Sequence, residues 1–162
     1  MTHVPDAFQD RLVRYAINLD YESLPEVTVH DARVRLIDTF GSLIGGFYGE
    51  ACRTSRATAA LYSSPFAATV IGTRNKSSAE MAAFANATTA RFVEMNDVYH
   101  WPGSGGGHPS DVIMPIFAVA EAAQSTGKEL ITAVVLGYEV FLRVAVGMSS
   151  EVASTLYRRF HC

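Results

Sequence analysis

The regular spacing of apolar residues constrains this chain more than any other feature of its sequence. In two stretches, apolar side chains recur at separations of three and four residues, which places them along one face of an α-helix. The first stripe comprises Leu36, Ile37, Phe40, Leu43, Ile44, Phe47 and Tyr48, and the second comprises Leu130, Ile131, Val134, Val135, Tyr138, Phe141 and Leu142. Stripes of this length predict an all-α fold, with the helices packed as a bundle or in layers.

Cap and turn residues predict where the helices begin and end. Thr28 is expected to cap the helix of the first stripe, and Gly45 and Gly46 mark a close packing site or the beginning of its end. Ser77 and Glu80 have the spacing of a capping box for another helix. Further helices are expected over residues 8–18, 54–62, 81–95 and 111–125, the last of these with Ser110 and Asp111 as its cap. Gly127 separates that helix from the helix of the second stripe. Residues 68–73, ATVIGT, are the candidate for one short strand.

Composition and charge narrow the class of protein. The 162 residues suffice for one domain, which we take to be residues 1–162. With 49% hydrophobic and 18% charged residues the chain is more apolar than an average soluble domain, which indicates surface that is buried against something else. The formal charge of -3, without a cluster of Lys and Arg, argues against a nucleic-acid partner.

The sequence also bears on membranes, location and metals. The apolar stretch at residues 130–148 is interrupted by Glu139 and Arg143, so it predicts a core helix and no membrane span. Residues 1–10 lack the basic start and apolar core of a secretory signal, which favours a cytoplasmic location. Cys52 and Cys162 are far apart and have no Cys or His companion, so we expect no zinc site and no iron–sulfur cluster.

A loop is expected from Asn96 to Pro109, because this segment contains two prolines and four glycines. Catalytic groups often lie on loops held by rigid elements, whereas polar residues after a helix can also serve solubility alone. The glycines do not have the order of a phosphate-binding loop, so nucleotide binding is not expected. The densest set of ionisable and aromatic side chains lies in and just before this loop, at Glu94, Asn96, Asp97, Tyr99, His100, Trp101 and His108.

Two histidines are candidates for chemistry. His108 lies two residues before the expected cap of the next helix, where free N–H groups and the helix dipole favour an anion such as a carboxylate. The alternative is that His108 only packs in the loop. His161 follows Arg158 and Arg159, so it either adds an imidazole beside two cations or belongs to a basic end of the chain.

Several segments together resemble the MmgE/PrpD family. These are LPEVTVHDARVRLIDTFGSLIGG, ATVIGT, SSAEMAAFANATTARFVEMND and HPSDVIMPIFAVAEAAQSTGKELITAVVLGYEV, and the HPSD block after an acidic motif with Asn-Asp is the most specific of them. The resemblance implies lyase chemistry on small polycarboxylic acids, such as dehydration of 2-methylcitrate or decarboxylation of cis-aconitate. It also implies a helical domain, a smaller lid domain, a homodimer, and no metal or organic cofactor.

The resemblance assigns site residues by position. The family's acidic motif falls on Glu94, Asn96, Asp97 and Val98, its loop histidine on His108, and its later R-F-H histidine on His161. Glu94 stands where Asp is usual, and Val98 where Thr is common. Because family members are more than twice as long, the resemblance leads us to expect an incomplete helical domain without the lid and without the lysines that hold substrate carboxylates in the family.

The implied chemistry is removal of a proton next to a carboxylate, with acid assistance to the leaving group. Imidazoles suit both steps, because their pKa values lie near operating pH. His108 and His161 are the candidates for acid/base or carboxylate-binding roles, and either Asp97 or Glu94 orients an imidazole or acts as the base. We expect the chain to be inactive alone; the alternative is a catalytically silent helical module for binding or oligomerisation.

Overall fold

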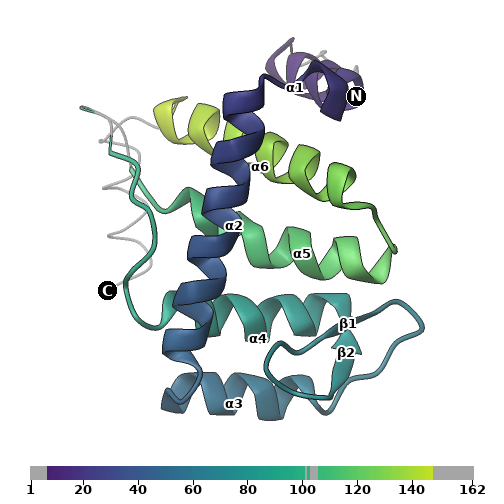
Figure 1. The fold of residues 1–162 in the computed structure, drawn as a ribbon, viewed down its shortest axis with the longest axis vertical. Coiled ribbons are helices and arrows are strands. Elements are labelled where there is room, and N and C mark those ends of the chain that lie inside the picture. The colour runs from purple at the N-terminus through teal and green to yellow at the C-terminus, as the bar shows by residue number, and fades with distance from the viewer. Residues whose placement is uncertain (1–6, 101, 103–105, 148–162) are drawn as a thin grey trace, which may run out of the picture.

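The computed structural model describes residues 7–100, 102 and 106–147. Helices dominate this part of the chain, which confirms the expected fold class (Figure 1). The α-helices are α1 (Ala7–Asn18), α2 (Glu26–Gly46), α3 (Glu50–Ala59), α4 (Ala79–Arg91), α5 (Ile113–Ala122) and α6 (Gly127–Gly147). Two 3-10 helices, η1 (Tyr21–Ser23) and η2 (Pro109–Val112), and two strands, β1 (Ala67–Thr69) and β2 (Lys76–Ser78), complete the described elements.

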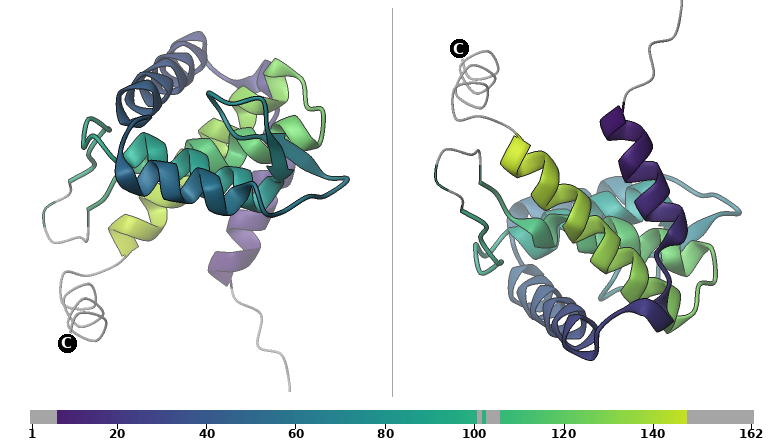
Figure 2. Two further views of the ribbon diagram at one scale, coloured as in Figure 1. Left: turned by 90° about the horizontal axis from the view of Figure 1, so that it is seen from below. Right: turned by 90° about the horizontal axis from the view of Figure 1, so that it is seen from above.

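The helices form a stack that α2 crosses. In Figure 1, α3, α4, α5 and α6 lie one above another, and each neighbouring pair is in contact. α2 runs across them and packs against both α4 and α6, whereas α1 lies at the α6 end of the stack (Figure 2). The largest fully buried side chains where these helices meet are Leu43, Ile113, Met114 and Val134.

A second, smaller core lies between α3, α4 and the strands. It is built mainly from alanines, and such small side chains let the backbones approach closely. Ala59, Ala82 and Ala85 are fully buried there beside Ala68 of β1. The expected short strand is therefore confirmed at the start of the run 68–73.

The second strand was not predicted, and the cap of α4 also differs from the expected one. Ser77 pairs with Ala68 in the antiparallel hairpin, and its buried hydroxyl donates to the carbonyl of Ala59 at 2.7 Å. The expected cap at Ser77 is therefore wrong, because α4 begins only at Ala79 and the Ser77 hydroxyl is bonded to Ala59 instead. Ser78 is the cap instead, and its Oγ accepts the N–H of Met81 at 3.4 Å.

Two other cap assignments are also wrong. Thr28 lies inside α2, which begins at Glu26 directly after Pro25, because the fixed φ of proline suits the entry into a helix. Ser110 and Asp111 lie inside η2, and α5 begins only at Ile113. In both places the chain enters helical geometry before the residue that the side-chain pattern singled out.

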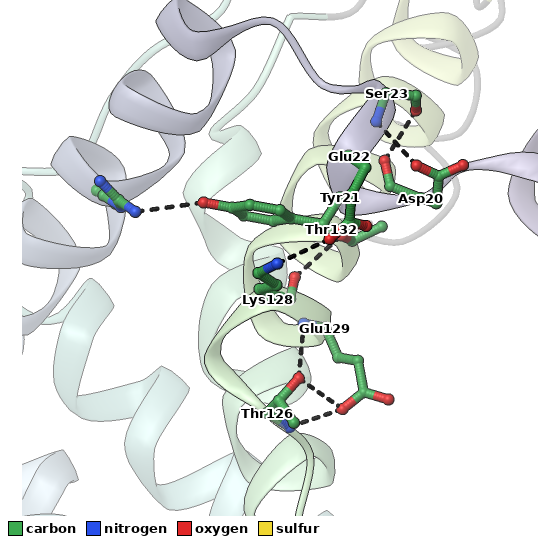
Figure 3. A network of polar contacts seen from close by, with 9 residues as sticks. Asp20, Tyr21, Glu22, Ser23, Thr126, Lys128, Glu129 and Thr132 are labelled. Atoms are coloured by element: carbon green, nitrogen blue, oxygen red, sulfur yellow. Dashed lines mark hydrogen bonds and ion pairs between the residues drawn. The ribbon is translucent and has the colours of Figure 1, made fainter.

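A capping box that was not predicted opens α6. The N–H of Thr126 donates to Oε2 of Glu129 at 2.6 Å, and the N–H of Glu129 donates back to Oγ1 of Thr126 at 3.3 Å (Figure 3). Gly127 is therefore the first residue of α6 and not a separator before it. The sequence Thr-Gly-Lys-Glu has the spacing that this motif requires.

The start of α6 is also tied to η1. Nζ of Lys128 lies 2.7 Å from Oε1 of Glu22, and it lies 5.0 Å from the centre of the Tyr21 ring (Figure 3). Asp20 caps η1, since its Oδ1 accepts the N–H of Ser23 at 2.8 Å. The hydrogen bond from Lys128 lowers the pKa of the Glu22 carboxyl. These contacts connect the link between α1 and α2 to the start of α6.

Part of the first apolar stripe remains exposed. Leu43 is buried, but Ile37 is 73%, Ile44 is 71% and Tyr48 is 80% exposed. The expected apolar surface therefore lies on the outer side of α2. Within the described residues, no helix combines the length and the hydropathy that crossing a membrane requires.

Candidate active site

The glycine loop folds back on itself and brings two arms together. The backbones of Tyr99 and Gly107 form an antiparallel bridge, with N–O distances of 2.7 and 2.9 Å. Gly107 has a φ of 152°, and a Cβ placed there would lie 2.8 Å from the Phe141 ring, so a side chain would not fit. The bridge places the segment after α4 beside the start of η2.

Asp97 is at the centre of this junction. Its Oδ1 accepts the backbone N–H of Ser110 at 3.0 Å, and its Oδ2 accepts the hydroxyl of Tyr138 at 2.9 Å. Its backbone carbonyl lies 2.7 Å from Nδ1 of His108. The structure thus joins three segments through one residue: the end of the α4 region, the start of η2, and the middle of α6.

The contact with Asp97 defines the tautomer of His108. A carbonyl oxygen can only accept, so Nδ1 of His108 must carry the hydrogen that it donates. In the neutral ring, Nε2 is then the nitrogen with the free lone pair. His108 is half-buried, and a ring fixed in this way can take up or release a proton at Nε2.

Tyr138 remains a donor in this arrangement. Burial is the main cause that raises the pKa of the Tyr138 phenol, and the nearby Asp97 carboxylate raises it further. Its hydroxyl therefore stays protonated and donates to Asp97. In the sequence Tyr138 belongs to an apolar stripe, and nothing in the local pattern indicates a partner 41 positions away.

Glu94 lies beside the junction in a second ionic group. Nη2 of Arg91 is 3.1 Å from Oε1 of Glu94, and Nε of Arg91 is 3.4 Å from Oδ1 of Asp111. Glu94 has a φ of 51°, and its side chain is 72% exposed. Desolvation raises the pKa of Asp111, and this effect is larger than the lowering of that pKa by Arg91 and His108. The three acids and His108 are thus close enough to influence one another.

Some buried polar atoms around the junction have no hydrogen-bond partner among the described residues. They are Oγ of Ser110, Oδ1 of Asn96 and Nη1 of Arg91. Ser110 is 3% exposed, so its hydroxyl is not simply solvated. Buried polar groups normally have partners, so ordered water or a polar ligand is the expected partner of these three atoms.

Two hollows adjoin the junction. A cleft of about 350 Å³ is lined by Arg35, Asp97, Tyr138 and Glu139, among others. A larger groove of about 860 Å³ lies between α5 and α6 and is lined mainly by apolar residues such as Ile116, Leu136 and Val140. The cleft at Asp97 and the apolar groove thus lie beside the same loop.

The structure brings together Asp97 and His108 and places Glu94 near them. His161, the fourth predicted site residue, lies outside the described residues. Within the described ranges, no group of three His, Cys, Asp or Glu side chains is arranged to hold a metal ion. Arg91 was also missed, although its separation of three residues from Glu94 is typical of an ion pair on a helix.

Comparison with known proteins gives one family match. The family model described as the MmgE/PrpD N-terminal domain matches residues 10–158. This range includes the loop, the junction at Asp97 and all of α2 to α6. No solved structure matches the chain.

Proposed function

The chain belongs to the MmgE/PrpD family, and on this premise we propose that it supplies the acid/base part of a lyase site for small polycarboxylic acids. The reaction class is dehydration of a 2-methylcitrate-like acid or decarboxylation of a cis-aconitate-like acid, without metal or organic cofactor. The observation that carries the proposal is the hydrogen bond from Nδ1 of His108 to the Asp97 carbonyl. This bond places the hydrogen on Nδ1 and leaves Nε2 as the nitrogen that exchanges a proton.

His108 is the proposed acid/base group. In a dehydration, a base removes the proton next to a carboxylate, and an acid protonates the hydroxyl that leaves as water. In a decarboxylation, an acid delivers a proton to the carbon that loses carbon dioxide. A positioned imidazole typically accelerates such proton transfers by about 100-fold to 10,000-fold. His161 is proposed as a second imidazole for the same site.

The charges at the junction favour the further proposal that the chain does not turn over such acids alone. The carboxylates of Glu94, Asp97 and Asp111 gather at this junction, and Arg91 is already paired with two of these acids. A substrate with three carboxylates would meet net repulsion unless further cations were added. A longer product or a second chain would have to provide them.

The proposal can be tested by titrating the isotope-labelled chain with citrate and tricarballylate. We expect binding that is weak because of this repulsion, and that shifts the NMR signals of His108 and the amide of Ser110, because both groups are bonded to Asp97 at the junction. His108→Ala should abolish the shift of Ser110. His100→Ala is the matched control, because His100 is an exposed histidine of the same loop. Equal effects of the two substitutions would contradict the proposal, and so would turnover of cis-aconitate by the homogeneous chain.

A second candidate function is a catalytically silent module that binds a partner or a second copy. It is favoured by one observation, the exposed apolar side of α2 at Ile37, Ile44 and Tyr48. A homodimer is the form of association that we propose, together with a cytoplasmic location. Sedimentation velocity tests the association, and a monomer at all concentrations would contradict it.

A further inference from the structure

Tyr138 is an α6 residue whose side chain reaches the candidate site. Its hydroxyl lies 2.9 Å from Oδ2 of Asp97. We propose that Tyr138 is a positioning residue that holds Asp97, and through Asp97 the imidazole of His108, in the orientation that proton transfer requires. The inference rests on the proposed acid/base role of His108 and extends that site to α6.

The contact between Tyr138 and Asp97 is a charge-assisted hydrogen bond. An ionised carboxylate can only accept, and the Tyr138 hydroxyl keeps its proton because burial and the carboxylate both raise its pKa. Hydrogen bonds with an ionised partner are roughly twice as strong as neutral ones. The bond therefore fixes the side chain of Asp97 more firmly than a contact between two neutral groups would.

The other oxygens of Asp97 extend this restraint to His108. Oδ1 accepts the N–H of Ser110, which stands two residues after His108, and the backbone carbonyl accepts Nδ1–H of His108 itself. The carboxylate is thus held from two sides, by η2 through Ser110 and by α6 through Tyr138. If the hydroxyl of Tyr138 is removed, Asp97 keeps its anchor on η2 and loses its anchor on the core helix.

The middle of α6 is a suitable rigid support. Val134 and Val135, one turn before Tyr138, are buried in the main core against α2 and α5. The bridge between Tyr99 and Gly107 joins the two loop arms to each other but not to that core. Tyr138 therefore ties the loop arm at Asp97 directly to a core helix, in addition to the tie through Ser110 of η2.

The test is a comparison of Tyr138→Phe with Tyr99→Phe in the 162-residue chain. Both substitutions remove one phenol hydroxyl, but only Tyr138 donates to Asp97. The readout is the nitrogen-15 spectrum of the His108 ring, assigned with His108→Ala, which reports the ratio of the Nδ1–H to the Nε2–H tautomer. We expect Tyr138→Phe to lower this ratio by up to about five-fold, the factor that corresponds to complete loss of the His108–Asp97 hydrogen bond at a net value of about 1 kcal/mol. Tyr99→Phe should leave it unchanged.

The outcomes separate this inference from the proposed function. An unchanged tautomer ratio in Tyr138→Phe would overturn the positioning role, as would an equal decrease in both variants. If Tyr138→Phe does not fold, Asp97→Asn replaces it, because an amide has one oxygen where the carboxylate has two to accept the hydrogen bonds of Ser110 and Tyr138. The same decrease in the tautomer ratio is expected. An unchanged ratio in Asp97→Asn overturns the inference. The ratio is measured without substrate. Failure of the chain to bind a polycarboxylate would therefore count against the proposed function and not against the role of Tyr138.

Discussion

The close contact between α2 and α4 at Gly46 allows a quantitative prediction. A Cβ at Gly46 would lie 2.2 Å from the backbone carbonyl oxygen of Thr89 and 3.2 Å from Cβ of Phe92. A contact of 2.2 Å with backbone cannot be relieved by rotating a side chain, so one helix must move. At Gly41, in the same helix, a Cβ would have no heavy atom of another residue within 4 Å, apart from its chain neighbours and the backbone of its own helix. The two glycines thus offer the same substitution with and without a steric conflict.

Alanine at Gly41 and alanine at Gly46 should change the free energy of unfolding in opposite directions. Gly41→Ala should stabilise the fold by about 0.5–1 kcal/mol, because alanine loses less backbone entropy than glycine in a helix. Gly46→Ala gains part of the same entropic stabilisation, but it overpacks the contact with Thr89, and overpacking typically costs about 1–3 kcal/mol and occasionally more. The two variants should therefore differ by about 1–4 kcal/mol in their free energy of unfolding.

The assay is urea unfolding followed by circular dichroism, at a protein concentration low enough that association does not contribute. Because both variants are glycine-to-alanine changes in α2, their slopes with urea concentration should agree and the midpoints can be compared directly. A Gly46→Ala midpoint equal to or above that of Gly41→Ala would refute the reasoning. It would mean that α2 and α4 do not approach each other as closely as the structure shows.

Further predictions concern pH, association and turnover. Desolvation raises the pKa of Glu121, but hydrogen bonds from Thr69 and Lys76 outweigh it and leave the pKa below its usual value. The stability that this carboxylate contributes is present above the ordinary pKa of Glu and is lost as pH falls through the lowered pKa, so acid should destabilise the chain. Glu121→Gln should weaken this pH dependence of the free energy of unfolding, measured at several pH values. Ile44→Lys should reduce self-association in sedimentation velocity, whereas Val93→Ala, a change at a half-buried site, should not; equal association of both would exclude the outer side of α2 as the interface. In a full-length family enzyme with this segment, His108→Ala should lower turnover about 100-fold to 10,000-fold with little effect on the melting temperature, and a variant that melts early but keeps normal turnover would contradict the role of His108.

Several features of the candidate site could be predicted from the sequence. The loop was expected because prolines and glycines disfavour helical continuation, and the family motif singled out Glu94, Asp97 and His108. The structure places Asp97 and His108 in direct contact and Glu94 nearby, beside Arg91. The sequence left open whether Asp97 is a base or orients an imidazole. Each of its two carboxylate oxygens accepts a hydrogen bond, one from Ser110 and one from Tyr138, which supports the orienting role.

The sequence by itself determined the features that depend on neighbours a few residues away. The apolar spacing of three and four residues is enough to define a helix face, and thus α2 and α6 were expected from their stripes. Caps were less well determined, because Ser77 and Ser78 are equally able to accept an N–H. In the structure the Ser77 hydroxyl donates to the carbonyl of Ala59, and Ser78, directly before α4, is the cap.

Only the tertiary structure decided which distant residues meet. Tyr138 has the same apolar spacing as the core residues around it, and its hydroxyl finds Asp97 only after α6 has packed beside α5 and the loop has folded back. The stripe on α2 likewise did not show which of its members are buried, since Leu43 faces the stack and Ile44 faces outward. The physical reason is that helical periodicity is a local property of the backbone, whereas burial and side-chain partners depend on the position of other helices.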